Sequence, residues 1–144
     1  MIVKYLLDTD HISFLQRRCG SEFQYLAARI ARHPTTDFAL SIVSFHEQTL
    51  GAHSLINRAQ KNSDTVRGYS LLSEIQQGFS IAPVLPFGAG EIAVFDDLRR
   101  QRVRVSTMDL RIAAIALSRA LILLTRNVRD FSKVPGLTTE DWTV

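Results

Sequence analysis

The sequence predicts an α/β fold in which a small parallel sheet is flanked by helices. Apolar runs of strand length alternate with longer segments of helical character along the 144 residues, a pattern that favours parallel strands joined by helices. No internal repeat, low-complexity tract or linker rich in Gly, Pro or Ser interrupts this alternation. The length suits one domain with a buried core. We therefore expect a single α/β domain over residues 1–144.

The amino-terminal part opens with an apolar run that predicts a strand over residues 2–7. A helix is expected after Asp10. Apolar residues at helical spacing indicate a second helix over residues 21–32. His33-Pro34 ends that helix, because the residue before a proline avoids the helical region.

The middle of the chain continues the alternation. The apolar segment 38–43 predicts a second strand, and residues 44–57 and 63–77 predict two further helices. Residues 79–84 predict a third strand, with Pro83 marking its end or an edge position.

The carboxyl-terminal part begins with a predicted helix over residues 88–102. A second helix opens at Asp109 and is nearly all small and apolar, which indicates burial. Residues 121–125 predict the next strand, and a short closing segment starts at residue 134, with Trp142 expected to anchor the terminus.

Four acidic residues occupy matching places in this pattern. Asp8, Glu47 and Asp130 each lie at or beyond the end of a predicted strand, and Asp109 begins a helix. In an open parallel sheet, the carboxyl ends of the strands and the starts of the helices face one crevice. Carboxylates gathered there repel one another unless a cation lies between them. Since oxygen-only ligands favour Mg²⁺ or Mn²⁺ over zinc, we predict a hard-metal site of the kind that cuts phosphodiesters.

Local explanations of the same acids remain open. Asp8 could be a turn residue and Asp10 a helix cap. Ser44 and Glu47 have the spacing of a capping box, in which the glutamate bonds back to the helix start. For Asp8 the metal-ligand hypothesis and the local one weigh about equally, whereas the capping box is the simpler reading of Glu47 alone.

The same alternatives apply to the last two acids. Ser106 and Asp109 also have capping spacing, but the apolar helix that follows argues against an ordinary solvated cap. The positive end of the helix dipole would help to keep Asp109 ionised, as a metal ligand must be. Asn127 and Asp130 could simply cap a polar turn.

Neighbouring polar side chains are expected to orient the ligands. Thr9 would hold Asp8 by a hydrogen bond, with Asp10 or Ser13 nearby. The residues expected in this supporting role are Thr9, Asp10, Thr125 and Asn127.

The basic residues suggest a polyanionic substrate. The net charge is only +3, but four arginines crowd residues 99–104, and Arg126 and Arg129 flank the fourth acidic position. Basic groups around an acidic centre suit a nucleic acid held against metal. For any single arginine, solvation of a helix face is the simpler explanation.

The remaining composition narrows the class of protein. No apolar run approaches the roughly 18 residues that a membrane helix needs, and the start runs straight into Asp8, unlike a signal peptide. The lone Cys19 fits a reducing compartment, and the four histidines lack zinc spacing. A cytoplasmic protein is expected.

Together these segments resemble the PIN-domain ribonucleases, in particular the VapC-like toxins of bacterial toxin–antitoxin pairs. The resemblance covers nearly the whole chain. It is carried by Leu6-Leu7-Asp8-Thr9-Asp10, Ser41-Ile42-Val43-Ser44-Phe45-His46-Glu47, Met108-Asp109-Leu110-Arg111-Ile112-Ala113-Ala114, Leu124-Thr125-Arg126-Asn127-Val128-Arg129-Asp130-Phe131 and Val134-Pro135-Gly136-Leu137.

The resemblance implies a three-layer PIN-like fold, dimerisation, an antitoxin partner and Mg²⁺- or Mn²⁺-dependent cleavage of RNA that leaves a 5′-phosphate. It makes Asp8, Glu47 and Asp109 the three family acids and Asp130 a more variable fourth. Two departures are notable: Asp10 stands where many relatives have Asn, and His46 replaces a small or apolar residue. Neither removes a ligand.

Two other functions fit parts of the sequence. A strand followed by Asp8-Thr9-Asp10 also begins the haloacid-dehalogenase-type phosphatases, in which Asp8 would be a covalent nucleophile, but Lys61, Lys133 and Asp96-Asp97 are poorly placed to complete such a site. A PIN-like module that binds RNA or a partner without cutting is the second alternative.

Overall fold

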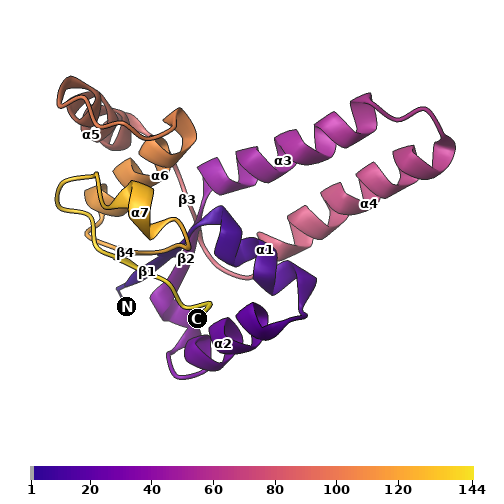
Figure 1. Ribbon diagram of the computed structural model, residues 1–144, viewed down its shortest axis with the longest axis horizontal. Helices are drawn as coiled ribbons and strands as arrows, with labels where there is room; N and C mark the ends of the chain where they lie inside the picture. The colour runs from indigo at the N-terminus through magenta and orange to yellow at the C-terminus, as the bar shows by residue number, and fades with distance from the viewer. Residues whose placement is uncertain (1) are drawn as a thin grey trace.

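The computed structural model describes residues 2–144 and contains a five-stranded sheet in the order β3-β2-β1-β4-β5 (Figure 1). Every pairing in it is parallel, which confirms the predicted fold class. The strands are β1 (Tyr5–Leu7), β2 (Phe38–Ser41), β3 (Val84–Leu85), β4 (Ile122–Leu124) and β5 (Thr139–Glu140).

The helices lie on both faces of the sheet, and two of them form an arm. Helices α3 and α4 pack as an antiparallel hairpin that projects from the body of the molecule (Figure 1). The helices are α1 (Thr9–Arg17), α2 (Ser21–Ile30), α3 (Ile42–Asn57), α4 (Asn62–Gly78), α5 (Ala89–Arg100), α6 (Thr107–Ser118) and α7 (Val128–Phe131), with a 3₁₀ turn at Thr35–Asp37.

Successive strand residues belong to different cores, because side chains alternate across a sheet. Leu6 and Leu123 join a core with α5 and α6. Leu7 and Leu124 join a second core with α1, α2 and α4. The largely apolar sequences of β1, β2 and β4 follow from this, since both faces are covered.

Several predicted boundaries were wrong, with identifiable causes. The predicted strand 79–84 is shifted to Val84–Leu85: Phe79 ends α4, and the Pro83 carbonyl accepts from the Leu40 N–H at 2.8 Å. The predicted strand 38–43 stops at Ser41, whose hydroxyl accepts from the Ser44 N–H and caps α3. Strand β5 was not predicted, because two residues carry too little pattern.

The carboxyl ends of β1, β2 and β4 open at one edge of the sheet, where α1 and α3 begin. This edge holds the acidic residues considered next. Among residues 2–144 no helix has the length and apolar character needed to span a bilayer.

Candidate active site

Asp8 lies directly after β1 and is 6% exposed. It caps α1, and its Oδ1 accepts from the Thr9 N–H at 2.8 Å. Its Oδ2 accepts from the Thr125 hydroxyl at 2.7 Å, across 117 residues of sequence. The local prediction that Asp10 caps the helix was therefore wrong, because Asp8 does so. Asp8 therefore both caps α1 and belongs to the acid cluster.

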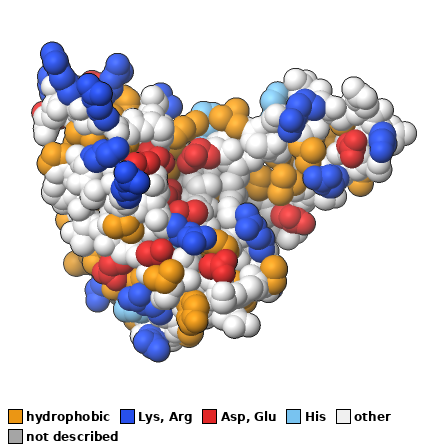
Figure 2. Space-filling view, in the orientation of Figure 1, with side chains coloured by type: hydrophobic (Ala, Val, Ile, Leu, Met, Phe, Trp, Pro, Cys, Tyr) orange, Lys and Arg blue, Asp and Glu red, His pale blue; other side chains and the backbone are white. Residues whose placement is uncertain are grey.

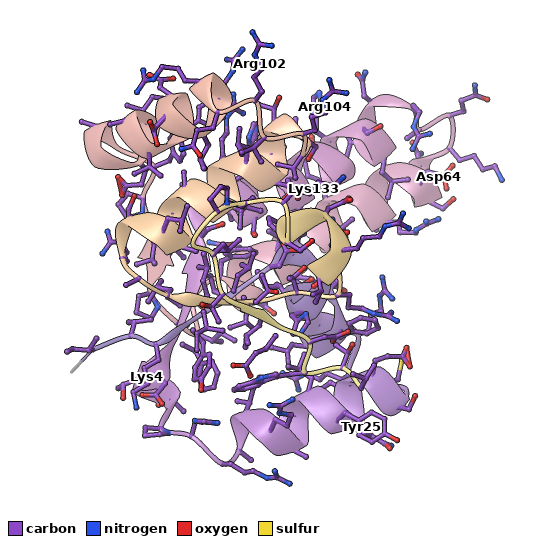
Figure 3. All side chains as sticks on the ribbon, turned by 60° about the vertical axis from the view of Figure 1, so that its left-hand side comes forward. Lys4, Tyr25, Asp64, Arg102, Arg104 and Lys133 are labelled. Atoms are coloured by element: carbon purple, nitrogen blue, oxygen red, sulfur yellow. The ribbon has the colours of Figure 1, made fainter. Side chains whose placement is uncertain are left out.

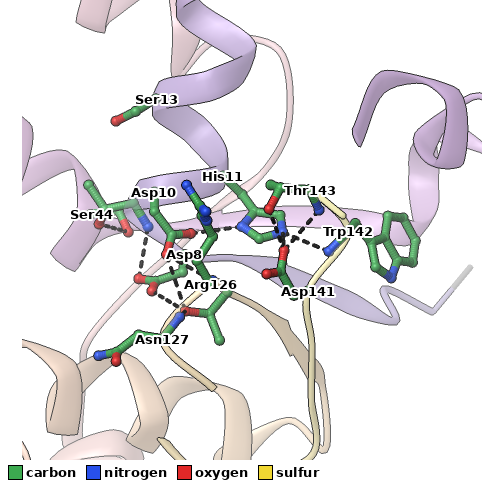
Figure 4. Close-up of polar contacts among 12 residues, drawn as sticks. Asp8, Asp10, His11, Ser13, Ser44, Arg126, Asn127, Asp141, Trp142 and Thr143 are labelled. Atoms are coloured by element: carbon green, nitrogen blue, oxygen red, sulfur yellow. Dashed lines mark hydrogen bonds and ion pairs between the residues drawn. The ribbon is translucent and has the colours of Figure 1, made fainter. Parts of the chain in front are cut away.

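The turn after β4 is fixed to Asp8 and Asp10 (Figure 4). Thr125 is fully buried, and its Oγ1 accepts from the Asn127 N–H at 3.0 Å. Asp10 Oδ2 accepts from the Arg126 N–H at 2.9 Å and lies 3.4 Å from Thr125 Oγ1. The structure thus brings Asp8, Asp10, Thr125 and Asn127 together.

Glu47 is held through Thr9. The Thr9 hydroxyl lies 2.9 Å from Glu47 Oε1 and 2.9 Å from the hydroxyl of Ser44, which is buried. The predicted hydrogen bond from Thr9 to Asp8 is present and is made by the Thr9 backbone N–H, whereas the Thr9 side chain orients Glu47. The capping box at Ser44 was wrong, because α3 begins two residues earlier with Ser41 as its cap.

Asp109 is the third residue of α6. Its N–H donates to the hydroxyl of Ser106, the helix cap, at 3.2 Å. The run Ile112–Ala116 is buried, as the sequence predicted. Asp109 itself is half-buried at the amino end of this helix.

Asp130 lies at the outer rim. It belongs to the one-turn helix α7 rather than to the predicted loop. Its side chain is 46% exposed, and Lys133 Nζ lies 3.4 Å from its Oδ1. Hydrogen bonds from Asn127 and Lys133 lower its pKa.

The inner acids respond to one another and to burial. Burial, then the charge of Asp10, raises the pKa of Asp8 to about 7. Burial also raises the pKa of Glu47, with Asp109 adding to the rise. Burial raises the pKa of Asp109 too, with contributions from Asp130 and Asp10. Acidic side chains accordingly gather at the centre of the face seen in Figure 2, with basic ones around them.

The donor chemistry of this cluster suits Mg²⁺ or Mn²⁺, because its ligands are carboxylate oxygens whose pKa values are raised by burial and by neighbouring acids. Among residues 2–144, however, no three His, Cys, Asp or Glu side chains are placed so that they could hold one ion together. Binding would therefore need a shift of at least one acidic side chain, or water ligands.

The basic residues surround the acids without pairing to the buried ones. Arg126 and Arg129 are exposed, and the Arg126 guanidinium lies 5.4 Å from the centre of the Phe14 ring. Arg102 and Arg104 point outward from the turn between α5 and α6 (Figure 3).

Two further residues take part in the site in ways the sequence did not reveal. Ser44 and the fully buried His11 join the hydrogen-bond network. Ser13, predicted near Asp8, lies apart and contacts Gln48 at 3.4 Å instead (Figure 4). His46 is exposed, as expected for a surface histidine.

Comparison with known proteins identifies relatives over the whole chain. It is 27% identical to ribonuclease VapC1 of Haemophilus influenzae strain R2866, covering 96% of this chain and 98% of the relative. It is 26% identical to the tRNA(fMet)-specific endonuclease VapC of Salmonella typhimurium, covering 98% and 99%. With ribonuclease VapC1 of Rickettsia felis it shares 31% identity over 86 residues, 57% of this chain and 62% of the relative.

Solved structures share the fold. A DNA-bound VapBC of Salmonella typhimurium superposes with a TM-score of 0.78 at 23% identity, covering 98% of this chain and 99% of the other. VapBC-1 of nontypeable Haemophilus influenzae gives a TM-score of 0.75 at 24% identity over all of both chains. The family described as PIN domain matches residues 5–137. With the four acids at the sheet edge, this match shows that the chain belongs to the PIN domain family.

Proposed function

We propose that this chain is a metal-dependent endoribonuclease that cleaves RNA phosphodiesters, and that it is the toxin of a toxin–antitoxin pair. Relatives that align with nearly its full length are named ribonucleases and a tRNA-specific endonuclease. Two solved proteins of the same fold are VapBC complexes. The observation that carries the proposal is the convergence of Asp8, Glu47 and Asp109 at the carboxyl edge of the sheet.

The acids divide the work in this proposal. Asp8 and Asp109 are the chief ligands of Mg²⁺ or Mn²⁺, while Glu47 and Asp130 bind through water or complete a second site. When bound, the cation would supply a more acidic attacking water and charge neutralisation at the phosphate. Thr125 keeps an Asp8 oxygen in place, and Thr9 does the same for Glu47. Both carboxylates therefore enter the reaction with their orientation already set.

RNA would meet the basic residues first. Arg126 and Arg129 are exposed on the turn and helix that follow β4, beside the acids. Contacts from such arginines to phosphates fix the position of the RNA and confer no sequence specificity. We assign Arg126 and Arg129 to the RNA backbone for that reason.

An antitoxin partner is supported by the VapBC complexes among the solved structures of this fold, and the homodimer is proposed from the family resemblance. A small antitoxin protein would bind the toxin and block access of RNA or metal to the acids, and two toxin chains would form a homodimer. We place the protein in the cytoplasm, where its RNA substrates are.

The phosphatase and the inactive PIN-like module are no longer equally supported as alternative functions. Membership of the PIN domain family removes the main support for a dehalogenase-type phosphatase, which rested on Asp8-Thr9-Asp10 alone. Asp96 and Asp97, the paired acids considered for such a site, are exposed on α5, away from Asp8. A PIN-like module without activity keeps the same fold and is separated only by an assay.

The decisive assay incubates the purified protein with total RNA in Mg²⁺, in Mn²⁺ and in EDTA. We expect cleavage by the wild type with either metal and none in EDTA, and from Asp109→Asn at most about a thousandth of the wild-type rate in any buffer. Loss of several kcal/mol of metal stabilisation corresponds to roughly a thousandfold slower cleavage. Circular dichroism should show that Asp109→Asn is folded. Cleavage at the wild-type rate by this variant would refute the proposal.

A further inference from the structure

His11 is a buried histidine that the proposed chemistry does not use. It is the third residue of α1 and is completely inaccessible to solvent. Both ring nitrogens have partners (Figure 4): Nδ1 lies 2.7 Å from Asp10 Oδ1, and Nε2 accepts from the Trp142 N–H at 3.2 Å. The imidazole therefore stands between the carboxyl-terminal segment and a carboxylate beside the acid cluster.

These partners fix the position of the ring proton. A nitrogen that accepts from a backbone N–H carries no proton, so the proton of His11 sits on Nδ1 and is donated to Asp10. Asp141 Oδ1 is 3.8 Å from Nε2, beyond hydrogen-bond reach, and accepts from the Thr143 N–H at 2.8 Å instead. Nothing on the tail side competes for the proton.

Trp142, which supplies the N–H, is itself held firmly. Its ring centre lies 4.8 Å from that of Tyr5 and 5.2 Å from that of His33, against which it stacks. The Arg29 guanidinium lies over the indole at 4.6 Å, and the indole N–H donates to Glu140 at 2.8 Å. The prediction that Trp142 anchors the terminus is confirmed by its burial, and its backbone amide is a fixed point for His11.

Asp10 connects His11 to the turn that follows β4. One carboxylate oxygen accepts from His11, and the other accepts from the Arg126 N–H. Asparagine has a single carbonyl oxygen, so it could not accept with both side-chain atoms, which accounts for an acid at this position. Asp10 thereby clamps the turn that presents Thr125 to Asp8.

We propose that His11 is a positioning residue, which ties the segment Glu140–Val144 to the acid cluster by orienting Asp10 and, through it, the Thr125–Asn127 turn. It touches neither substrate nor metal. The proposal deepens the proposed nuclease function, and it rests on that function only where metal or RNA is used to test it. Groups that orient metal ligands in this way typically change metal affinity or activity by about 10- to 100-fold.

Two substitutions separate the two contacts of the ring. The amide nitrogen of His11→Asn occupies a place like that of Nδ1 and can still donate to Asp10. The amide oxygen of His11→Gln reaches further, like Nε2, and can accept from the Trp142 N–H while losing the donor to Asp10. Trp142→Phe is the matched control, because it removes the indole and keeps the backbone N–H.

The main readout is the NMR signal of the Arg126 amide, which reports its hydrogen bond to Asp10 without metal or RNA. We expect this signal to move upfield in His11→Gln and to stay in place in His11→Asn and Trp142→Phe, although Trp142→Phe lowers thermal stability. In His11→Gln, Mn²⁺ should bind about 10- to 100-fold more weakly and kcat should fall with KM nearly unchanged. An unmoved Arg126 signal in folded His11→Gln, or losses that follow thermal stability alone, would overturn the proposal.

If the His11 variants do not fold, a measurement on the wild type still tests the proposal. Nitrogen-15 shifts of the His11 ring should show the proton on Nδ1, and a proton on Nε2 would contradict the proposal. If the wild type neither binds Mn²⁺ nor cuts RNA, the nuclease function fails. The Arg126 and ring-nitrogen signals still decide the role of His11 in that case.

Discussion

The acid cluster has two halves that are built differently. In the first half Asp8 and Thr125 are buried, and both oxygens of Asp8 are hydrogen-bonded: one is held by a backbone amide and the other by the Thr125 hydroxyl. On the other side, Asp109 is half-buried, and Asp130 is 46% exposed and paired with Lys133. The first half is fixed by strands β1 and β4, whereas the second sits on the ends of two helices.

This difference explains how the site can gather acids although no three of the side chains described for residues 2–144 are placed to hold one metal ion together. The Asp8 half is held in place by groups from distant parts of the chain. In the Asp109 half, the acidic side chains are only partly buried. We interpret the Asp8 half as the fixed half and the Asp109 half as the adjustable half. A cation would neutralise the negative charge of both.

The largest stability effect expected is that of Asp8→Asn in metal-free protein. The pKa of Asp8 rises from 3.8 in the unfolded chain to about 7 in the folded one, so the folded state resists ionisation of this group. The contribution of Asp8 to stability is therefore largest below pH 3.8 and is lost as the pH rises to about 7. Because asparagine cannot ionise, Asp8→Asn should raise the free energy of unfolding at pH 8 by at most about 4 kcal/mol.

Urea unfolding in EDTA between pH 4 and pH 8 measures this difference. The curves of Asp8→Asn and wild type should diverge up to about pH 7 and run parallel above it. Asp109→Asn, from the adjustable half, should diverge much less. Equal divergence of the two variants would break the distinction between the halves.

Removal of single hydroxyls gives a smaller effect. Thr125→Val leaves the buried Asp8 Oδ2 and the partly buried Asn127 N–H without their partner, which should cost roughly 1–3 kcal/mol. Thr9→Val, which affects the half-buried Glu47, is the matched control and should cost less. Chemical denaturation of both variants at pH 7 tests the order, and a larger loss in Thr9→Val would contradict it.

The smallest effect is expected at the rim. Lys133→Ala removes the ion pair to Asp130, but both side chains are about half exposed. The change in free energy of unfolding should stay within about 0.5 kcal/mol. A loss several times larger in thermal unfolding would mean that Asp130 belongs to the fixed half after all.

Local pattern predicted much of this arrangement. Leu6-Leu7 followed by Asp8 marked a buried strand ending in an acid, and the apolar helix after Asp109 marked a buried element starting with one. Both features depend on residues within a few positions of each other. The parallel topology then predicts that these acids lie close together, because parallel strands end at the same edge of the sheet.

Contacts between distant residues could not be predicted in the same way. Thr9 reaches Glu47 across 38 residues, and Trp142 reaches His11 across 131. Strand β5 is two residues long and pairs only because β4 offers a free edge. Such features arise from packing, so a hydroxyl or imidazole in the sequence does not reveal its partner.

The central claim is that acids from both halves share a divalent ion, and anomalous diffraction from a crystal soaked in Mn²⁺ tests it most directly. We predict a manganese peak contacting Asp8 and Asp109, with the larger side-chain shift on Asp109. Manganese bound only elsewhere, with Asp8 and Asp109 unmoved and separate, would contradict the account.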